Sequence, residues 1–118
     1  MEKKLYDSEL KIMEILWKQG DTTAKEIAAA LYQQIGWSKT TTYTVIKKCI
    51  TKGAIERKEP NFICRALISK EEAQEYETQE LIEKLYDGCP DKLIASVISG
   101  KAMDKDKILR LKELINKL

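Results

Sequence analysis

The sequence predicts a mainly α-helical fold with one small β-hairpin, followed by a helical tail. Apolar residues recur at helical spacing through most of the 118 residues. Residues 54–68 depart from this spacing, because two short runs there flank a Pro-Asn turn, a pattern typical of a hairpin. Hydrophobic residues make up 43% and charged residues 34% of a chain with net charge +2, as in soluble globular proteins.

Two helices are expected in the first third of the chain. The first begins at Asp7 or Ser8, both favourable N-cap residues, and ends near Gly20. The second begins with a capping box, in which Thr23 and Glu26 satisfy each other's backbone N–H groups, and stops about the next glycine. The stripes expected to be buried contain Leu10, Ile12, Met13, Leu16 and Trp17 in the first helix, and Ile27, Ala28, Leu31 and Ile35 in the second.

A third helix is expected from Ser38, its N-cap, to Lys52 and Gly53. At about 100° per residue, the stripe that faces the core contains Thr42, Val45, Ile46 and Cys49. The opposite face and its flanks carry no acidic side chain and consist of Lys39, Thr40, Thr41, Tyr43, Thr44, Lys47, Lys48 and Thr51. Lysines neutralise phosphates, and threonine hydroxyl and methyl groups contact phosphates or base edges. Since threonine is a poor helix former, this face suits a DNA groove better than plain exposure to solvent.

The hairpin after this helix is basic. Residues 54–58 and 62–68 form its strands, and its basic residues are Arg57, Lys58 and Arg65. Three helices followed by a basic hairpin predict a winged helix-turn-helix, in which the third helix reads DNA and the hairpin, or wing, lies along the backbone. The alternative is an α+β domain whose hairpin only covers the core. Glu59 at the tip favours that alternative slightly, because an acid there repels phosphate.

Charge is distributed unevenly along the chain. Residues 1–68 hold 12 basic and 8 acidic residues, a net charge of +4, whereas residues 69–118 hold 9 and 11, a net charge of −2. Within the first part, residues 38–65 hold 7 basic and 2 acidic residues. We therefore expect a winged-helix DNA-binding domain over residues 1–68, with double-stranded DNA as its partner, and a tail with another role over residues 69–118.

The sequence disfavours several classes of function. It has no histidine, no glycine-rich phosphate loop and no Cys-x-x-Cys pair, so we expect no enzyme, metal site, cofactor or small-molecule substrate. It shows no membrane span and no signal peptide, which predicts a cytoplasmic protein. Cys49, Cys64 and Cys89 are expected to be mainly small buried hydrophobes. Two alternatives stay open: a DNA-binding regulator that senses thiol oxidation through Cys89, and a winged-helix module for protein contacts.

The tail is expected to form three amphipathic helices. Ser69 and Glu72 open the first with a capping box, residues 87–90 break it, and a short helix and a last helix over residues 104–118 follow. So short a segment cannot bury three apolar stripes alone, so we expect a homodimer; packing against the winged domain is the alternative. A two-fold dimer places two reading helices about 34 Å apart along DNA. The candidate dimerisation residues are Tyr76, Ile82, Leu85, Leu93, Val97, Ile108, Leu111 and Ile115.

Three stretches resemble the penicillinase-repressor family: residues 7–17, residues 37–46, which open with Trp-Ser-x-x-Thr-x-x-Thr, and residues 52–58. The resemblance extends over nearly the whole chain. It implies a dimeric winged-helix repressor that binds a palindromic operator and acts in antibiotic resistance, in the response to β-lactams or cell-wall stress. The copper-responsive relatives carry a C-terminal Cys-x-Cys cluster, which this sequence lacks, so copper sensing is not expected.

The resemblance also implies particular site residues. The family's DNA-contacting positions fall on Lys39, Thr40, Thr41, Tyr43, Thr44 and Lys47 in the reading helix and on Arg57, Lys58 and Arg65 in the wing. The wing tip differs from the family's usual glycine and basic residue, and Tyr43 replaces a glutamine of some members. In antibiotic-responsive members, a membrane sensor-peptidase leads to cleavage in the middle helix of the tail. The corresponding cleavage region here contains Ser96 and Val97.

Overall fold

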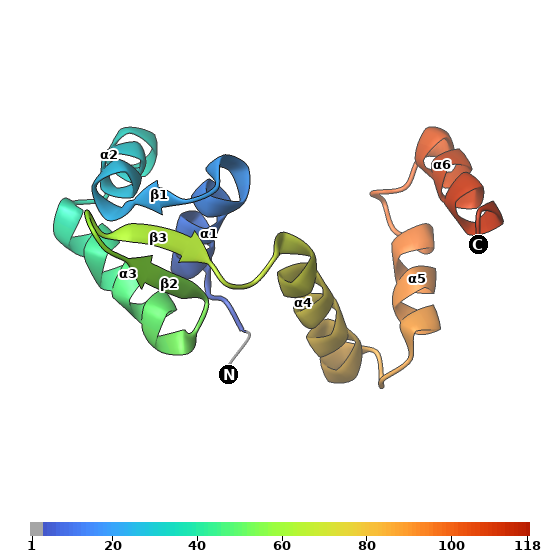
Figure 1. The fold of residues 1–118 in the computed structure, drawn as a ribbon. Coiled ribbons are helices and arrows are strands. Elements are labelled where there is room, and N and C mark those ends of the chain that lie inside the picture. The colour runs from blue at the N-terminus through green and yellow to red at the C-terminus, as the bar shows by residue number, and fades with distance from the viewer. Residues whose placement is uncertain (1–3) are drawn as a thin grey trace. The chain divides into compact units, whose positions relative to one another are not determined.

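The computed structural model describes residues 4–118, which contain six helices and three short strands (Figure 1). In chain order these are α1 (Asp7–Gln19), β1 (Thr22–Thr23), α2 (Ala24–Ile35), α3 (Lys39–Lys52), β2 (Ile55–Lys58), β3 (Ile63–Ala66), α4 (Lys70–Leu85), α5 (Pro90–Ser99) and α6 (Lys105–Asn116). The chain divides into two compact units, one that ends at Glu77 and one that begins at Thr78. The boundary therefore lies within α4, and the predicted order of helices and hairpin is confirmed.

The local hydrogen bonds that start α3 and α4 are those expected from the sequence. The Ser38 hydroxyl accepts a hydrogen bond from the Thr41 N–H at 3.1 Å. At the start of α4, the Glu72 N–H donates to the Ser69 hydroxyl and the Ser69 N–H donates to the Glu72 carboxylate. This reciprocal pair is a complete capping box.

The caps of α1 and α2 differ from the expectation. Tyr6 is the N-cap of α1, not Asp7 or Ser8, and its N–H donates to the Glu9 carboxylate at 2.8 Å. In α2 the Thr23 hydroxyl accepts from the Glu26 N–H, as expected, but the Glu26 carboxylate accepts from that hydroxyl and not from a backbone N–H. Both helices still begin within one residue of the predicted position.

The core of the first unit lies between α1, α2, α3 and the sheet. The predicted stripe of α3 is confirmed, since Thr42, Val45, Ile46 and Cys49 are all buried. Leu10 and Trp17 pack against this core only partly, and the Trp17 indole N–H donates to the Ile68 carbonyl oxygen at 3.0 Å. The expectation for Ile35 was wrong, because this residue at the last turn of α2 is 43% exposed.

The hairpin belongs to a three-stranded antiparallel sheet with strand order β1-β3-β2. Strands β2 and β3 pair with Ile55 opposite Ala66 and Lys58 opposite Ile63, as a hairpin predicts. Strand β1 has two residues and pairs Thr22 with Cys64. The sequence does not predict β1, because two residues are too few to show an alternating pattern. Its pairing joins the part of β3 next to the wing tip to the start of α2.

The second unit contains the end of α4 together with α5 and α6. Asp104 caps α6, and its carboxylate accepts from the Lys107 N–H at 2.9 Å. Within this unit the Tyr86 hydroxyl donates to the Ser96 hydroxyl at 3.1 Å. No residue of α5 or α6 is buried in the single chain. Two amphipathic helices thus leave their apolar stripes largely uncovered.

Candidate nucleic-acid interface

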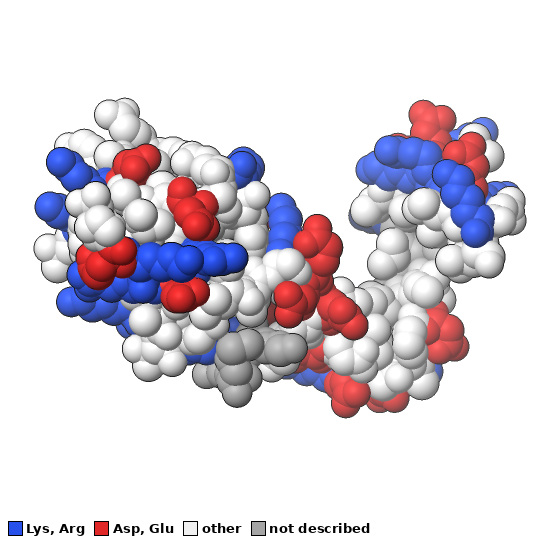
Figure 2. All heavy atoms as spheres, in the orientation of Figure 1, with Lys and Arg blue, Asp and Glu red and all other residues white. Residues whose placement is uncertain are grey.

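One face of α3 is both exposed and basic. The exposed residues of this face, called the reading face below, are Lys39, Thr40, Thr41, Thr44, Lys47, Lys48 and Thr51. Figure 2 shows blue side chains at the left and lower left of the first unit, where Figure 1 places α3. Over β2 and β3, the same view shows red side chains among the blue ones. Within the first unit, α3 therefore presents positive charge with less compensation than the front of the sheet.

Hydrogen bonds within α3 orient the threonines of the reading face. The Ser38 hydroxyl donates to the Thr41 hydroxyl oxygen at 3.0 Å, at the first turn of the helix. The Thr44 hydroxyl donates to the Thr40 carbonyl oxygen at 2.9 Å. Because its proton is used within the helix, Thr44 presents a methyl group and acceptor lone pairs outward, which suit a thymine methyl or a base amino group.

The lysines of α3 fall into three situations. The Lys39 ammonium lies 5.6 Å from the centre of the Tyr43 ring. Lys47 and Lys48 are exposed and have no hydrogen-bond or ion-pair partner among residues 4–118. Lys52, at the end of the helix, forms an ion pair with Glu9 at 2.7 Å. The charges of Lys47 and Lys48 are therefore available to an external anion, as is that of Lys39, which contacts only a ring.

The wing is held against α3 by aromatic contacts. Tyr43, which is half-buried, meets Phe62 edge to face, with ring centres 5.8 Å apart. The Arg57 guanidinium lies 3.7 Å from the centre of the Phe62 ring, on the wing itself. Sequence reasoning missed this cluster; its signal is that the chain's only phenylalanine stands beside the turn.

Glu59 stabilises the tip of the wing. Its carboxylate accepts from the Arg57 side chain and from the Phe62 N–H. The hydrogen bond from Arg57 is the main reason that the pKa of Glu59 lies below its ordinary value. Glu59 thus compensates Arg57, while Lys58 and Arg65 are exposed and have no ion-pair partner within the described part of the chain.

Two of the three cysteines are expected to be unreactive. Cys49 and Cys64 are buried, as expected, and burial raises the pKa of Cys49 to about 12 and that of Cys64 to about 11. Such thiols carry almost no thiolate, the reactive form, near neutral pH. Cys89 is half-buried, and its Sγ lies 3.6 Å from the Asp87 carbonyl oxygen.

The candidate residues of the tail differ in exposure. Leu85, Val97 and Ile115 are 67%, 47% and 53% exposed, whereas Ile82 is buried in the single chain. The half-buried candidates are Tyr76, Leu93, Ile108 and Leu111. Ser96 and Val97, the candidate cleavage region, are exposed and lie within α5.

Among residues 4–118, no group of three or more Cys, Asp or Glu side chains is placed to hold a metal ion. None of the described helices combines the length and the apolar character needed to cross a bilayer.

The chain is similar in fold and in sequence to known repressors. The DNA-binding domain of the repressor BlaI, a solution structure, superposes with a TM-score of 0.55 and 25% identity over 59% of this chain and 88% of that domain. This likeness confirms the predicted winged-helix fold. The methicillin resistance regulatory protein MecI of Staphylococcus aureus (strain N315) is 27% identical over 99% of both chains. The penicillinase repressor of Bacillus licheniformis is 20% identical over 95% of this chain and 89% of its own length.

The family model described as "Penicillinase repressor" matches residues 5–117, which is nearly the whole sequence and includes both compact units. The resemblance inferred from the three sequence stretches is thereby confirmed. The chain belongs to the penicillinase repressor family, a family of DNA-binding repressors and not of enzymes.

Proposed function

We propose that this protein is a homodimeric repressor that binds a palindromic operator in double-stranded DNA, in a response to β-lactams or cell-wall stress. The observation that carries the proposal is the reading face of α3, where lysines and threonines stand exposed without an acidic neighbour on that helix. Lysines there would neutralise phosphates, and Thr44 would face base edges. The related proteins named as regulators of methicillin resistance and as a penicillinase repressor support the choice of response.

The wing would add phosphate contacts beside the reading helix. Lys58 and Arg65 are the basic residues of the wing that have no ion-pair partner among residues 4–118, so they are the stronger candidates. Arg57, which the family pattern also assigns to DNA, is engaged by Glu59 and Phe62. Its guanidinium would act mainly by holding the wing in position.

The tail would join two copies and would also end repression. The large apolar side chains of α5 and α6 that are more than two-fifths exposed are Ile94, Val97, Ile98, Leu109, Leu114 and Ile115. A second copy of the chain would cover them, because a helix pair this short cannot bury its own stripes. Cleavage near Ser96 and Val97 in a membrane sensor-peptidase pathway would separate α6 from the winged domain. Ser96 is exposed and is not among the side chains that the second copy would cover, which supports this relief mechanism.

Binding to DNA is tested by fluorescence anisotropy across a salt series. The protein is titrated onto a duplex from the region upstream of its own gene and onto a scrambled duplex of equal length. We expect much tighter binding to the upstream duplex at physiological salt, with a steep decrease in affinity as salt rises, since several counterions are released. Absence of binding to either duplex at low salt would contradict the proposal.

Lys47→Ala and Thr44→Ala are expected to have different effects on DNA binding. Lys47→Ala should weaken binding to both duplexes alike and reduce the salt slope by about one, because a phosphate contact carries no sequence information. Thr44→Ala should relax the preference at one base pair of the upstream duplex. The measurement is anisotropy on single-base variants of the duplex, with Lys112→Ala on α6 as the control. Equal losses on upstream and scrambled DNA for both variants would refute this division.

A second candidate function is regulation by thiol oxidation. The observation that favours Cys89 is its partial exposure, since the other two cysteines are buried. An oxidant should then lower the DNA affinity of the wild type reversibly, and Cys89→Ser should abolish that change. A wild type whose affinity is unchanged by oxidant would eliminate this candidate without affecting the first.

A further inference from the structure

A surface groove separates the start of α1 from the outer side of α3. It has a volume of about 810 Å³, and its lining includes Tyr6 beside α1 and Thr44, Lys48 and Thr51 on α3. The three α3 residues are spaced four and three apart, so they line one side of the helix. The groove therefore includes part of the reading face, and Tyr6 forms its opposite wall.

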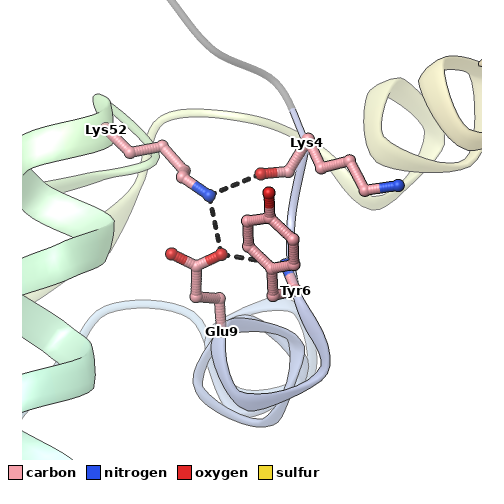
Figure 3. Close-up of polar contacts among 4 residues, drawn as sticks. All are labelled: Lys4, Tyr6, Glu9 and Lys52. Atoms are coloured by element: carbon pink, nitrogen blue, oxygen red, sulfur yellow. Dashed lines mark hydrogen bonds and ion pairs between the residues drawn. The ribbon is translucent and has the colours of Figure 1, made fainter.

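An ion pair with little exposure fixes the position of Tyr6 (Figure 3). The Lys52 ammonium lies 2.7 Å from the Glu9 carboxylate and also donates to the Lys4 carbonyl oxygen. The same Glu9 oxygen accepts from the Tyr6 N–H at 2.8 Å, and the Lys52 ammonium lies 4.8 Å from the centre of the Tyr6 ring. These four residues, called the Lys52 cluster below, tie the segment before α1 to the end of α3.

The charge of the groove is positive. Glu9, the acidic residue of its lining, is 3% exposed and is compensated by Lys52. Lys47 and Lys48 also line the groove, and neither has an ion-pair partner among the residues described. Tyr6 is 57% exposed, so its wall of the groove is open to a ligand. Two uncompensated ammonium groups with hydroxyl groups nearby suit a phosphate.

We propose that this groove binds one backbone phosphate of DNA, with the Lys48 ammonium and the hydroxyls of Tyr6 and Thr51 as donors. The inference rests on the proposed function, because it requires the reading face of α3 to lie against DNA. It extends that function by assigning Tyr6, which lies outside both the reading helix and the wing, to the interface. The Lys52 cluster positions this tyrosine before DNA arrives, which reduces the entropy lost on binding.

Tyr6→Phe is the test variant, because it keeps the ring beside Lys52 and removes only the hydroxyl. Tyr32→Phe is the matched control, since Tyr32 is 65% exposed on α2 and does not line the groove. We expect Tyr6→Phe to weaken binding to the upstream and scrambled duplexes alike, by about tenfold for each lost hydrogen bond to a charged group, one in each half-site. Thr51→Val should act in the same direction, and Tyr32→Phe should bind as the wild type does. Thermal denaturation checks that each variant is folded.

Duplexes with single uncharged methylphosphonate linkages identify the phosphate. In the wild type, several linkages in each half-site should reduce affinity; the groove's phosphate is the one whose neutralisation costs clearly less in Tyr6→Phe than in the wild type, because the tyrosine contact is already absent. The phosphate site is refuted if Tyr6→Phe binds as tightly as the wild type. It is also refuted if every methylphosphonate linkage reduces the affinity of Tyr6→Phe by the same factor as that of the wild type. If the wild type still prefers the upstream duplex in that case, the proposed function stands. If the wild type binds neither duplex, both proposals fall.

Discussion

Replacing Lys52 by methionine is expected to lower the free energy of unfolding by about 3–5 kcal/mol, the usual cost of removing one partner of a buried ion pair. Glu9 would then keep its carboxylate in a position that is 3% exposed, without the ammonium that lies 2.7 Å away. Methionine retains most of the length and volume of the lysine stem, so loss of packing contributes little. Urea denaturation followed by circular dichroism measures the change.

Two controls separate the buried charge from other effects of Lys52→Met. The double variant Glu9→Gln/Lys52→Met removes both charges of the buried pair and should recover much of the lost stability, because the glutamine carbonyl can still accept from the Tyr6 N–H. Lys70→Met breaks the Lys70–Glu14 pair, whose side chains are 46% and 41% exposed, and should cost less than about 1 kcal/mol. Equal losses for Lys52→Met and Lys70→Met would show that burial of the Lys52 cluster adds nothing.

The Lys52 cluster also shows which contacts of the fold can be predicted from the sequence and which cannot. The caps at Ser38 and Ser69 join atoms three residues apart, so a short pattern is enough to predict them. The bond between Lys52 and Glu9 joins residues 43 positions apart. In the sequence Lys52 is only a basic residue before a glycine, which is a common helix end. The pairing depends on how α1 packs against α3, and no local pattern contains that information.

The candidate interface also has one part that the sequence predicts and one part that it does not. The reading face follows from helical periodicity, because burial of Thr42, Val45, Ile46 and Cys49 fixes which side of α3 faces outward. The contacts within the wing cannot be predicted from periodicity. In sequence, Glu59 is an acid that would repel phosphate; in the structure it binds Arg57 and the Phe62 N–H, across a turn in which Asn61 and Phe62 have positive φ. Such a turn is specified by contacts between its own side chains, which no repeating pattern encodes.

Ile115→Glu in α6 is expected to dissociate the proposed dimer. Ile115 is 53% exposed in the single chain, and a charge there would be buried without a partner if a second copy covers α6. A monomer would bind one half-site at a time and lose the gain from linking two modules, so affinity for a palindromic duplex should decrease by about a hundredfold or more. Affinity for a single half-site should be unchanged, because the reading face is intact. Sedimentation velocity and anisotropy on the two duplexes measure these effects.

The neighbouring substitution Asn116→Glu makes the same change in charge one residue later. Asn116 is exposed and polar, so glutamate there should leave both the molecular mass and the affinity for the palindrome unchanged. If both variants lose the dimer, added negative charge in the tail is the cause rather than burial of the Ile115 side chain. A wild type that sediments as a monomer, or an Ile115→Glu variant that remains dimeric, would show that the apolar stripe of α6 has another use. The difference between these two adjacent positions therefore tests whether a second copy of the chain covers that stripe.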